Sequence, residues 1–217
     1  MIPQILNDVA EAIRNEKIAI SEDVEGEGRG GSLKDEGNII RFLKSYPDLG
    51  KYILNEKARR FGDMTVMDYD GKTTYVVNIK TSIGSSDNAT SKIGFLYALT
   101  DMEPEEMPGQ MNWKKFDELV KSRKADIPTK DYWFLCVDKN DSSNVLIRGA
   151  KQINCWALNA NPSNMLQINW KKEKTLPPVE RTYNESYDTL VGGIKRCMKK
   201  FLNNLPEVWY DEITTTL

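Results

Sequence analysis

The feature that most constrains the fold is a hairpin pattern between residues 63 and 80. Residues 63–69 alternate between polar and apolar side chains, and residues 73–80 are rich in β-branched and apolar side chains. Between them stands Asp70-Gly71, a dipeptide typical of tight hairpin turns because glycine accepts a positive φ. The sequence therefore predicts two antiparallel strands, with Asp63 at the start of the first and Lys80 at the end of the second.

The segments around this hairpin predict an α/β fold. Helical spacing of apolar residues predicts helices over 3–16, 32–60, 93–100, 112–124 and 183–204, the second capped by Ser32 or Asp35 and the last interrupted at Gly192-Gly193. Further strands are expected over 131–138, 145–148, 153–158 and 165–170, and loops over 26–31, 84–92, 102–109 and 159–164. This order predicts one domain over 1–217, with a central mixed β-sheet flanked by helices.

The amino-acid composition excludes several kinds of catalytic and metal site. The chain of 217 residues has no histidine, which excludes a Ser-His-Asp triad, a Cys-His pair and histidine-ligated zinc. A metal would be held by oxygen ligands, which favours Mg²⁺, Mn²⁺ or Ca²⁺. The net charge of -2 argues against a nonspecific polycation but allows DNA binding through one basic face. Three widely spaced cysteines, no secretory signal and no membrane-length apolar run indicate a cytoplasmic protein.

Three polar residues of the hairpin are expected to meet. Side chains alternate along a strand, so Asn78 and Lys80 share one face while Val77 and Ile79 point to the other. The turn brings Asp63 back beside them, at one edge of the sheet. A carboxylate and a neighbouring oxygen can hold Mg²⁺, and a lysine can orient or help to deprotonate a water for phosphodiester hydrolysis. The alternative is a hairpin end that only faces solvent.

Over residues 33–100 the motifs resemble the PD-(D/E)xK nuclease superfamily, and in particular type II restriction endonucleases of the EcoRV/HincII type. Gly62-Asp63 and Asn78-Ile79-Lys80-Thr81 match its signature, and Glu36 stands on a predicted helix before them. The resemblance implies a restriction-endonuclease-like fold, Mg²⁺ as cofactor (Mn²⁺ as a substitute), and a catalytic group of Asp63, Asn78, Lys80 and Glu36. It also implies a metal bound by Asp63, Asn78 and the carbonyl of Ile79. Beyond residue 100 the likeness is weak.

Two positions depart from the signature. Gly62 stands where the family often has proline, and Asn78 where it has an acidic residue. The lost carboxylate should weaken Mg²⁺ binding. Two explanations are open: natural variation, since the family includes Asp…NxK enzymes, or replacement of an original aspartate, which would leave this chain inactive.

We therefore expect a site-specific deoxyribonuclease of a restriction system, acting as a homodimer on a short palindrome in double-stranded DNA. Residues 33–100 would form the catalytic core and residues 140–205 the DNA-recognition and C-terminal helical part. Alternatives are a structure-specific nuclease of the junction-resolvase or repair type, and a non-catalytic DNA-binding module. The side chains expected to contact DNA are short polar groups, amides and cations suited to base edges and phosphates: Arg29, Thr81, Ser82, Ser85, Ser86, Asn88, Thr90, Ser91, Lys92, Asn164, Gln167, Asn169, Lys195 and Lys199.

Overall fold

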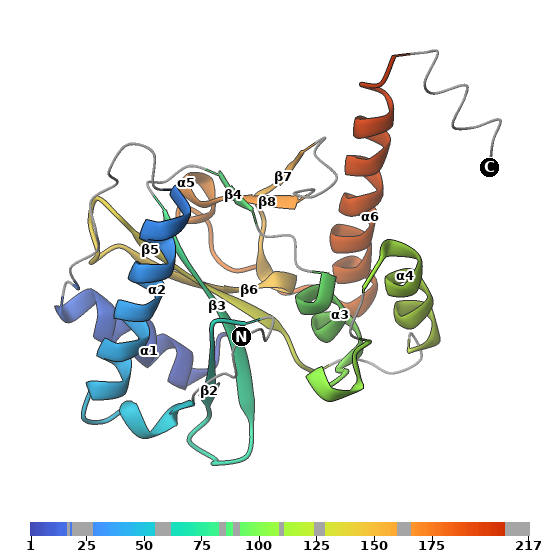
Figure 1. The fold of residues 1–217 in the computed structure, drawn as a ribbon. Helices are drawn as coiled ribbons and strands as arrows, with labels where there is room; N and C mark the ends of the chain where they lie inside the picture. Colours follow the sequence, from blue (N-terminus) through green and yellow to red (C-terminus); the bar gives the residue numbers. More distant parts are fainter. Residues whose placement is uncertain are drawn as a thin grey trace.

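The computed structural model describes residues 1–16, 18, 28–54, 62–82, 86–88, 92–108, 111–123, 129–159 and 166–206; of these, the side chains of 28–33, 86–88 and 104 are not described. Its centre is a five-stranded mixed sheet in the order β1-β2-β3-β5-β6 (Figure 1). The strands are β1 (Ile53–Leu54), β2 (Met64–Met67), β3 (Thr74–Ser82), β5 (Tyr132–Asp138) and β6 (Val145–Gly149). Only the pairing of β3 with β5 is parallel among these five. The predicted class, α/β with a central mixed sheet flanked by helices, is confirmed.

The predicted hairpin is β2 and β3. Their register pairs Met64 with Val77 and Met67 with Thr74. Gly71 has φ of 67°, as the turn requires. The Asp70 carboxylate accepts hydrogen bonds from the backbone N–H groups of Lys72 and Thr73, at 2.7 and 2.8 Å. Asp70 thus serves the turn, as its position next to Gly71 indicates.

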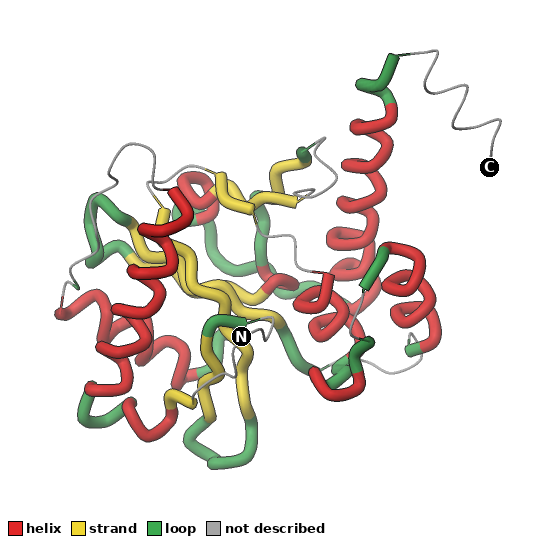
Figure 2. The backbone as a smooth tube through the Cα atoms, in the orientation of Figure 1, coloured by secondary structure: helices red, strands yellow, loops and turns green. Residues whose placement is uncertain are grey.

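Helices cover both faces of this sheet (Figures 1 and 2). Residues Val77, Ile79 and Leu135 belong to a core shared with α1 (Gln4–Glu16) and α2 (Gly28–Ser45). Alternate residues, such as Val76 and Phe134, belong to a second core with α3 (Lys92–Thr100), α4 (Trp113–Ser122) and α6 (Tyr183–Leu202). Because side chains alternate along a strand, successive apolar residues of β3 and β5 pack into two different cores, one on each face of the sheet.

A small second sheet lies beside the second core. It has the order β4-β8-β7, with β4 (Ser86–Asn88), β7 (Trp156–Leu158) and β8 (Leu166–Asn169), and the short helix α5 (Trp170–Glu173) follows it. Leu166 and Ile168 are fully buried. Trp170 is fully buried as well, 6.2 Å from the Phe134 ring. These side chains fix the small sheet and α5 to the main sheet.

Three boundaries on the N-terminal side differ from the sequence predictions. The second helix spans 28–45 instead of 32–60, so Ser32 and Asp35 lie inside it rather than at its cap. It stops before Pro47, which disfavours helical geometry at the residue before it. A 3-10 turn (Gly50–Tyr52) follows, and Ile53 then pairs with Val66 of β2 as a strand. Part of the expected loop 26–31 also belongs to the helix, which begins at Gly28.

Four places after the hairpin differ as well. The expected loop 84–92 contains β4, and the strand expected over 153–158 begins only at Trp156, after a 3-10 turn at Ala150–Gln152. Trp170, expected at the end of a strand, begins α5. The last helix runs through Gly192-Gly193 without a break. A Cβ at Gly193 would lie 3.1 Å from Leu166 Cδ2. Gly193 therefore permits close packing of α6 on β8 rather than ending the helix.

Candidate functional site

The candidate site is formed where the chain enters β2, beside the middle of β3. The backbone N–H of Asp63 donates to the Val77 carbonyl at 2.9 Å. The Asp63 carboxylate accepts a 2.6 Å hydrogen bond from the Ile79 N–H through Oδ2. This carboxylate therefore replaces a backbone acceptor in the ladder and is fixed against the stretch 77–79. Since β3 is the central strand, the group lies inside the sheet. The sequence prediction that it lies at one edge of the sheet is wrong.

Asn78 and Lys80 have the alternation that the sequence predicts. Val77 and Ile79 are fully buried, whereas Asn78 and Lys80 are half-buried and occupy the alternate positions of β3. Asp63 lies just before the paired residues of β2, and its N–H donates to the carbonyl of Val77, the register partner of Met64. Its carboxylate is bonded to the N–H of Ile79, the residue between Asn78 and Lys80, and it feels the Lys80 charge.

Gly62 explains how Asp63 comes so close to β3. A Cβ at Gly62 would lie 2.4 Å from Val76 Cγ1 and 3.3 Å from the Val77 carbonyl oxygen. A side chain here would push the entrance of β2 away from β3 and lengthen the Asp63–Val77 bond. The glycine that departs from the nuclease signature is therefore the residue that fits this backbone approach.

The electrostatics of Asp63 follow from its burial. Removal from water raises the pKa of the Asp63 carboxyl above its ordinary value, while the Ile79 N–H and the nearby Lys80 charge oppose that rise. Burial is the largest of these effects. A cation next to Asp63 Oδ1 would favour the ionised carboxylate. Binding of a cation there would therefore lower the pKa that burial raises.

The donors that could hold a metal are oxygen atoms: the Asp63 carboxylate, the Asn78 amide and the Ile79 carbonyl. These are the ligand types that Mg²⁺ prefers. Within the described ranges, no group of three or more Asp, Glu, Cys or His side chains is placed to hold a metal ion. One carboxylate with two neutral oxygens is a weak ligand set, and water or phosphate oxygens would have to supply the remaining ligands.

Glu36 lies half-buried on α2, which packs against the face of β3 that carries Val77 and Ile79. Its role as a supporting carboxylate stays a prediction. Its neighbour Asp35 is fully buried, and the Asp35 Oδ2 atom lies 3.8 Å from the Nζ of Lys139. The Lys139 N–H donates to the Ser82 carbonyl at 2.9 Å, so this carboxylate stands at the carboxyl end of β3.

A second ion pair stands at the same end of the parallel strands. Lys174 Nζ lies 2.8 Å from Asp138 Oδ2, and both side chains are largely buried. Asp138 is the register partner of Ser82. Sequence reasoning missed this cluster of Asp35, Asp138, Lys139 and Lys174, because Asp35 and Lys174 are far from Asp138-Lys139 in the chain and only the fold joins them.

The structure also joins two segments that were predicted separately as DNA-contacting loops. In the small sheet Ser86 pairs with Asn169, and Asn88 pairs with Gln167. Gln167 and Asn169 are half-buried and alternate with the buried Leu166 and Ile168. The amide residues of β8 therefore lie opposite the polar residues of β4, a few positions after Lys80 in the chain.

Several other expected DNA contacts have structural partners. The Lys92 Nζ lies 4.9 Å from the centre of the Trp113 ring and donates to the Met111 carbonyl at 3.3 Å. Asn169 accepts a bond from the Lys172 N–H at the start of α5. Ser82 is buried and Thr81 is half-buried.

The remaining expected contacts divide into two groups. Lys195 and Lys199 are exposed on α6. The others lie outside the described residues or have undescribed side chains: Arg29, Ser85, Ser86, Asn88, Thr90, Ser91 and Asn164.

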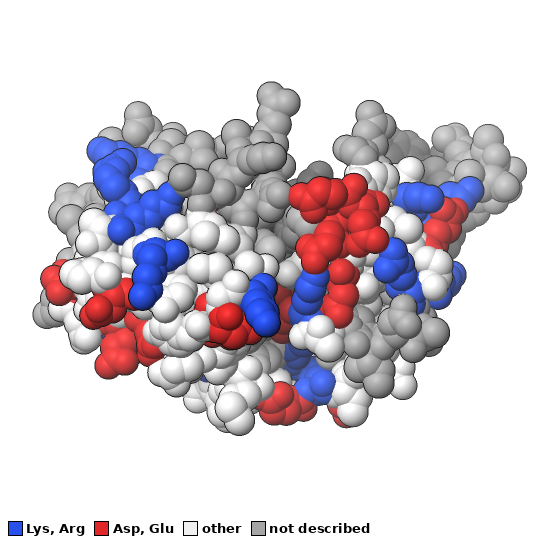
Figure 3. Space-filling model, turned by 90° about the horizontal axis from the view of Figure 1, so that it is seen from below, with Lys and Arg blue, Asp and Glu red and all other residues white. Residues whose placement is uncertain are grey.

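The charges on one face of the molecule are mixed. Figure 3 shows basic and acidic side chains interspersed there, with acidic side chains gathered in one cluster. Among the residues coloured in that view, the face forms no continuous basic surface.

Comparisons of the chain with protein-family models, with curated proteins and with solved structures found no match. In the part of the chain that the structure describes, no helix combines the length and apolar character needed to cross a membrane. Function must therefore be argued from the site itself.

Proposed function

We propose that the chain is a Mg²⁺-dependent nuclease that hydrolyses double-stranded DNA at a short palindromic site as a homodimer. The observation that carries this proposal is the Asp63 carboxylate, fixed to the Ile79 N–H of β3 between Asn78 and Lys80. The order of elements supports it. The helix with Glu36 comes first, followed by Asp63 at the hairpin, Asn78-Ile-Lys-Thr on β3, a polar segment and then α3.

Each residue would have a distinct role. Asp63, Asn78 and the Ile79 carbonyl would hold the ion, which when bound supplies positive charge to a phosphate and acidifies a water. Lys80, on the same face of β3 as Asn78, would orient the attacking water and stabilise the charge that develops on the phosphate. The amides of β8 and the polar residues of β4 would contact the duplex, since paired strands fit a DNA groove.

A non-catalytic DNA-binding module is the second candidate, and Asn78 favours it. A neutral amide in place of a second carboxylate lowers the negative charge of the site and weakens its attraction for Mg²⁺. Such a module would bind DNA without dependence on a divalent cation.

Cleavage of a long, unmethylated natural DNA with Mg²⁺ tests the proposal. The chain is compared with Asn78→Asp, Lys80→Ala and the control Lys72→Ala, an exposed lysine at the hairpin turn. Discrete fragments from the chain or from Asn78→Asp, lost in Lys80→Ala and kept in Lys72→Ala, are expected. Fragments from none of the variants would reject site-specific cleavage. Cutting of branched DNA alone would instead favour the structure-specific alternative.

A further inference from the structure

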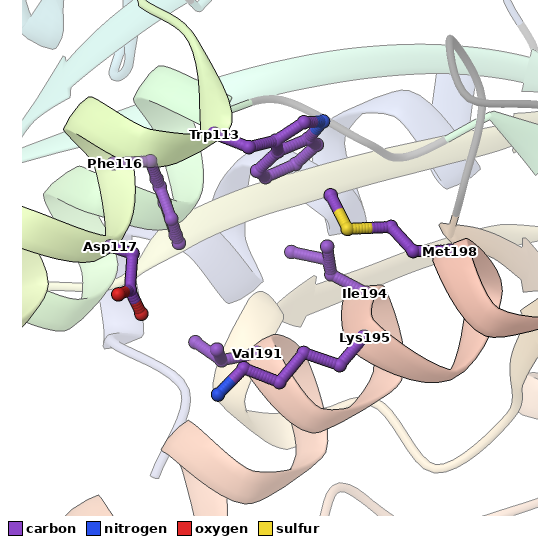
Figure 4. Close-up of a pocket in the computed structure, with 7 residues that line it drawn as sticks. All are labelled: Trp113, Phe116, Asp117, Val191, Ile194, Lys195 and Met198. Carbon is purple, nitrogen blue, oxygen red and sulfur yellow. The ribbon is translucent and has the colours of Figure 1, made fainter. Parts of the chain in front are cut away.

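An apolar groove lies between α4 and α6, away from the candidate site (Figure 4). Its volume is about 170 Å³, and it is open to solvent on one side. The aromatic rings of Trp113 and Phe116 line one wall, and Val191, Ile194 and Met198 line the other. An apolar cavity of about 150 Å³ in another protein accommodates benzene. This groove therefore has room for one aromatic group.

The charged residues at the border of the groove indicate what kind of ligand would bind there. Asp117 and Lys195 both lie at its border. Asp117 is paired with Lys121 at 2.5 Å. Lys195 is exposed, and among the described residues no carboxylate is paired with it. An aromatic side chain followed closely by an acidic one would satisfy both the cavity and this lysine.

The chain carries such a segment directly after α6. Residues 207–217 read Glu-Val-Trp-Tyr-Asp-Glu-Ile-Thr-Thr-Thr-Leu, with Trp209 and Tyr210 before Asp211 and Glu212. We propose that this segment binds the groove of its own chain, with Trp209 in the cavity and the two carboxylates at Lys195.

The distances permit this arrangement. Met198 stands four residues before the end of α6, about 6 Å along the helix axis. The Leu205 N–H donates to the Leu202 carbonyl at 3.0 Å, so the chain stays at the end of the helix up to that point. Trp209 is three residues beyond Pro206, a reach of about 10 Å. Covalent attachment gives the segment an effective concentration in the millimolar range, which favours it over a free ligand of the same chemistry.

Hydrogen exchange of the full chain, followed by mass spectrometry, tests this inference without DNA or metal. Amides of 207–217 should exchange at least about tenfold more slowly than in the free peptide of that sequence. Trp209→Ala and Lys195→Glu should each abolish this protection. Lys114→Glu, the same charge change at an exposed α4 residue that does not line the groove, should retain it.

Two controls make the result decisive. Protection of the α6 amides checks that Lys195→Glu still folds, and Trp209→Ala provides an independent variant in the segment itself. Glu212→Lys added to Lys195→Glu should restore protection by reversing both charges. Exchange of 207–217 at the rate of the free peptide would overturn the proposal. Protection that appears only at high protein concentration would also overturn it, since the segment would then bind a second copy.

Discussion

Substitution of Asp63 separates the structural role of its side chain from its charge. Asp63→Ala removes the acceptor of the Ile79 N–H, which lies in the middle of the sheet. A buried donor without a partner costs about 1–3 kcal/mol. Asp63→Asn keeps an oxygen that can accept this bond and removes only the charge. We therefore expect the free energy of unfolding to be lower for the alanine variant than for the asparagine variant by about 1–3 kcal/mol.

The sign of the charge effect follows from the pKa. Burial raises the folded-state pKa of Asp63 above 3.8, so the folded protein holds this proton more tightly than the unfolded chain does. The ionised carboxylate therefore disfavours folding as the pH rises from about 3.8 through the folded pKa. Asp63→Asn should accordingly be at least as stable as the parent near neutral pH, and this advantage should disappear in acid.

Urea denaturation without divalent cations, at neutral and at acidic pH, measures these differences for both variants. Equal destabilisation by alanine and asparagine at neutral pH would refute the reasoning, because the charge would then contribute to folding. A parent protein more stable than Asp63→Asn at neutral pH would also refute the reasoning. Addition of Mg²⁺ should raise the unfolding temperature of the parent and leave that of Asp63→Asn unchanged.

Three further predictions concern separate parts of the molecule. Trp170→Ala should lower the free energy of unfolding by about 3–5 kcal/mol in urea denaturation, because this ring is fully buried between the two sheets. Asn78→Asp should bind Mg²⁺ more tightly in calorimetry, since it adds a second carboxylate beside Asp63. Burial raises the pKa of Asp131 to about 6, so its contribution to stability should fall as the pH rises from about 4 to 6; Asp131→Asn, measured by denaturation across that range, should lack this decline.

The candidate site could be predicted from the sequence because its parts are local. Asp70-Gly71 fixes the turn of the hairpin, which returns Asp63 to residues 77–79 of β3, and alternation along β3 places Asn78 and Lys80 on one face. Residues 63–80 carry all of this information. The position of the hairpin in the centre of the sheet, by contrast, depends on the pairing of β1 with β2 and of β5 with β3. The strand over 131–138 was predicted, but its parallel pairing with β3 and the strand β1 were not.

The features that the sequence did not predict depend on distant partners. β4 has three residues, and it is a strand only because Asn88 pairs with Gln167 of β8. Gly193 suggests a helix break on propensity alone, but packing against Leu166 outweighs that preference. Asp35 resembles a helix cap in sequence, and its burial beside Lys139 follows from the parallel pairing of β3 and β5.

The local character of the hairpin has a consequence for folding order. The Asp63–Ile79 bond closes a loop of 16 residues, whereas pairing of Asn88 with Gln167 closes one of 79. The longer closure costs about 1.4 kcal/mol more in chain entropy. Substitutions in the hairpin should therefore slow folding, while substitutions in the small sheet should mainly speed unfolding. The candidate site of Asp63, Asn78 and Lys80 would then form in the folding transition state, before β4 and β8, the strands expected to contact DNA, have paired.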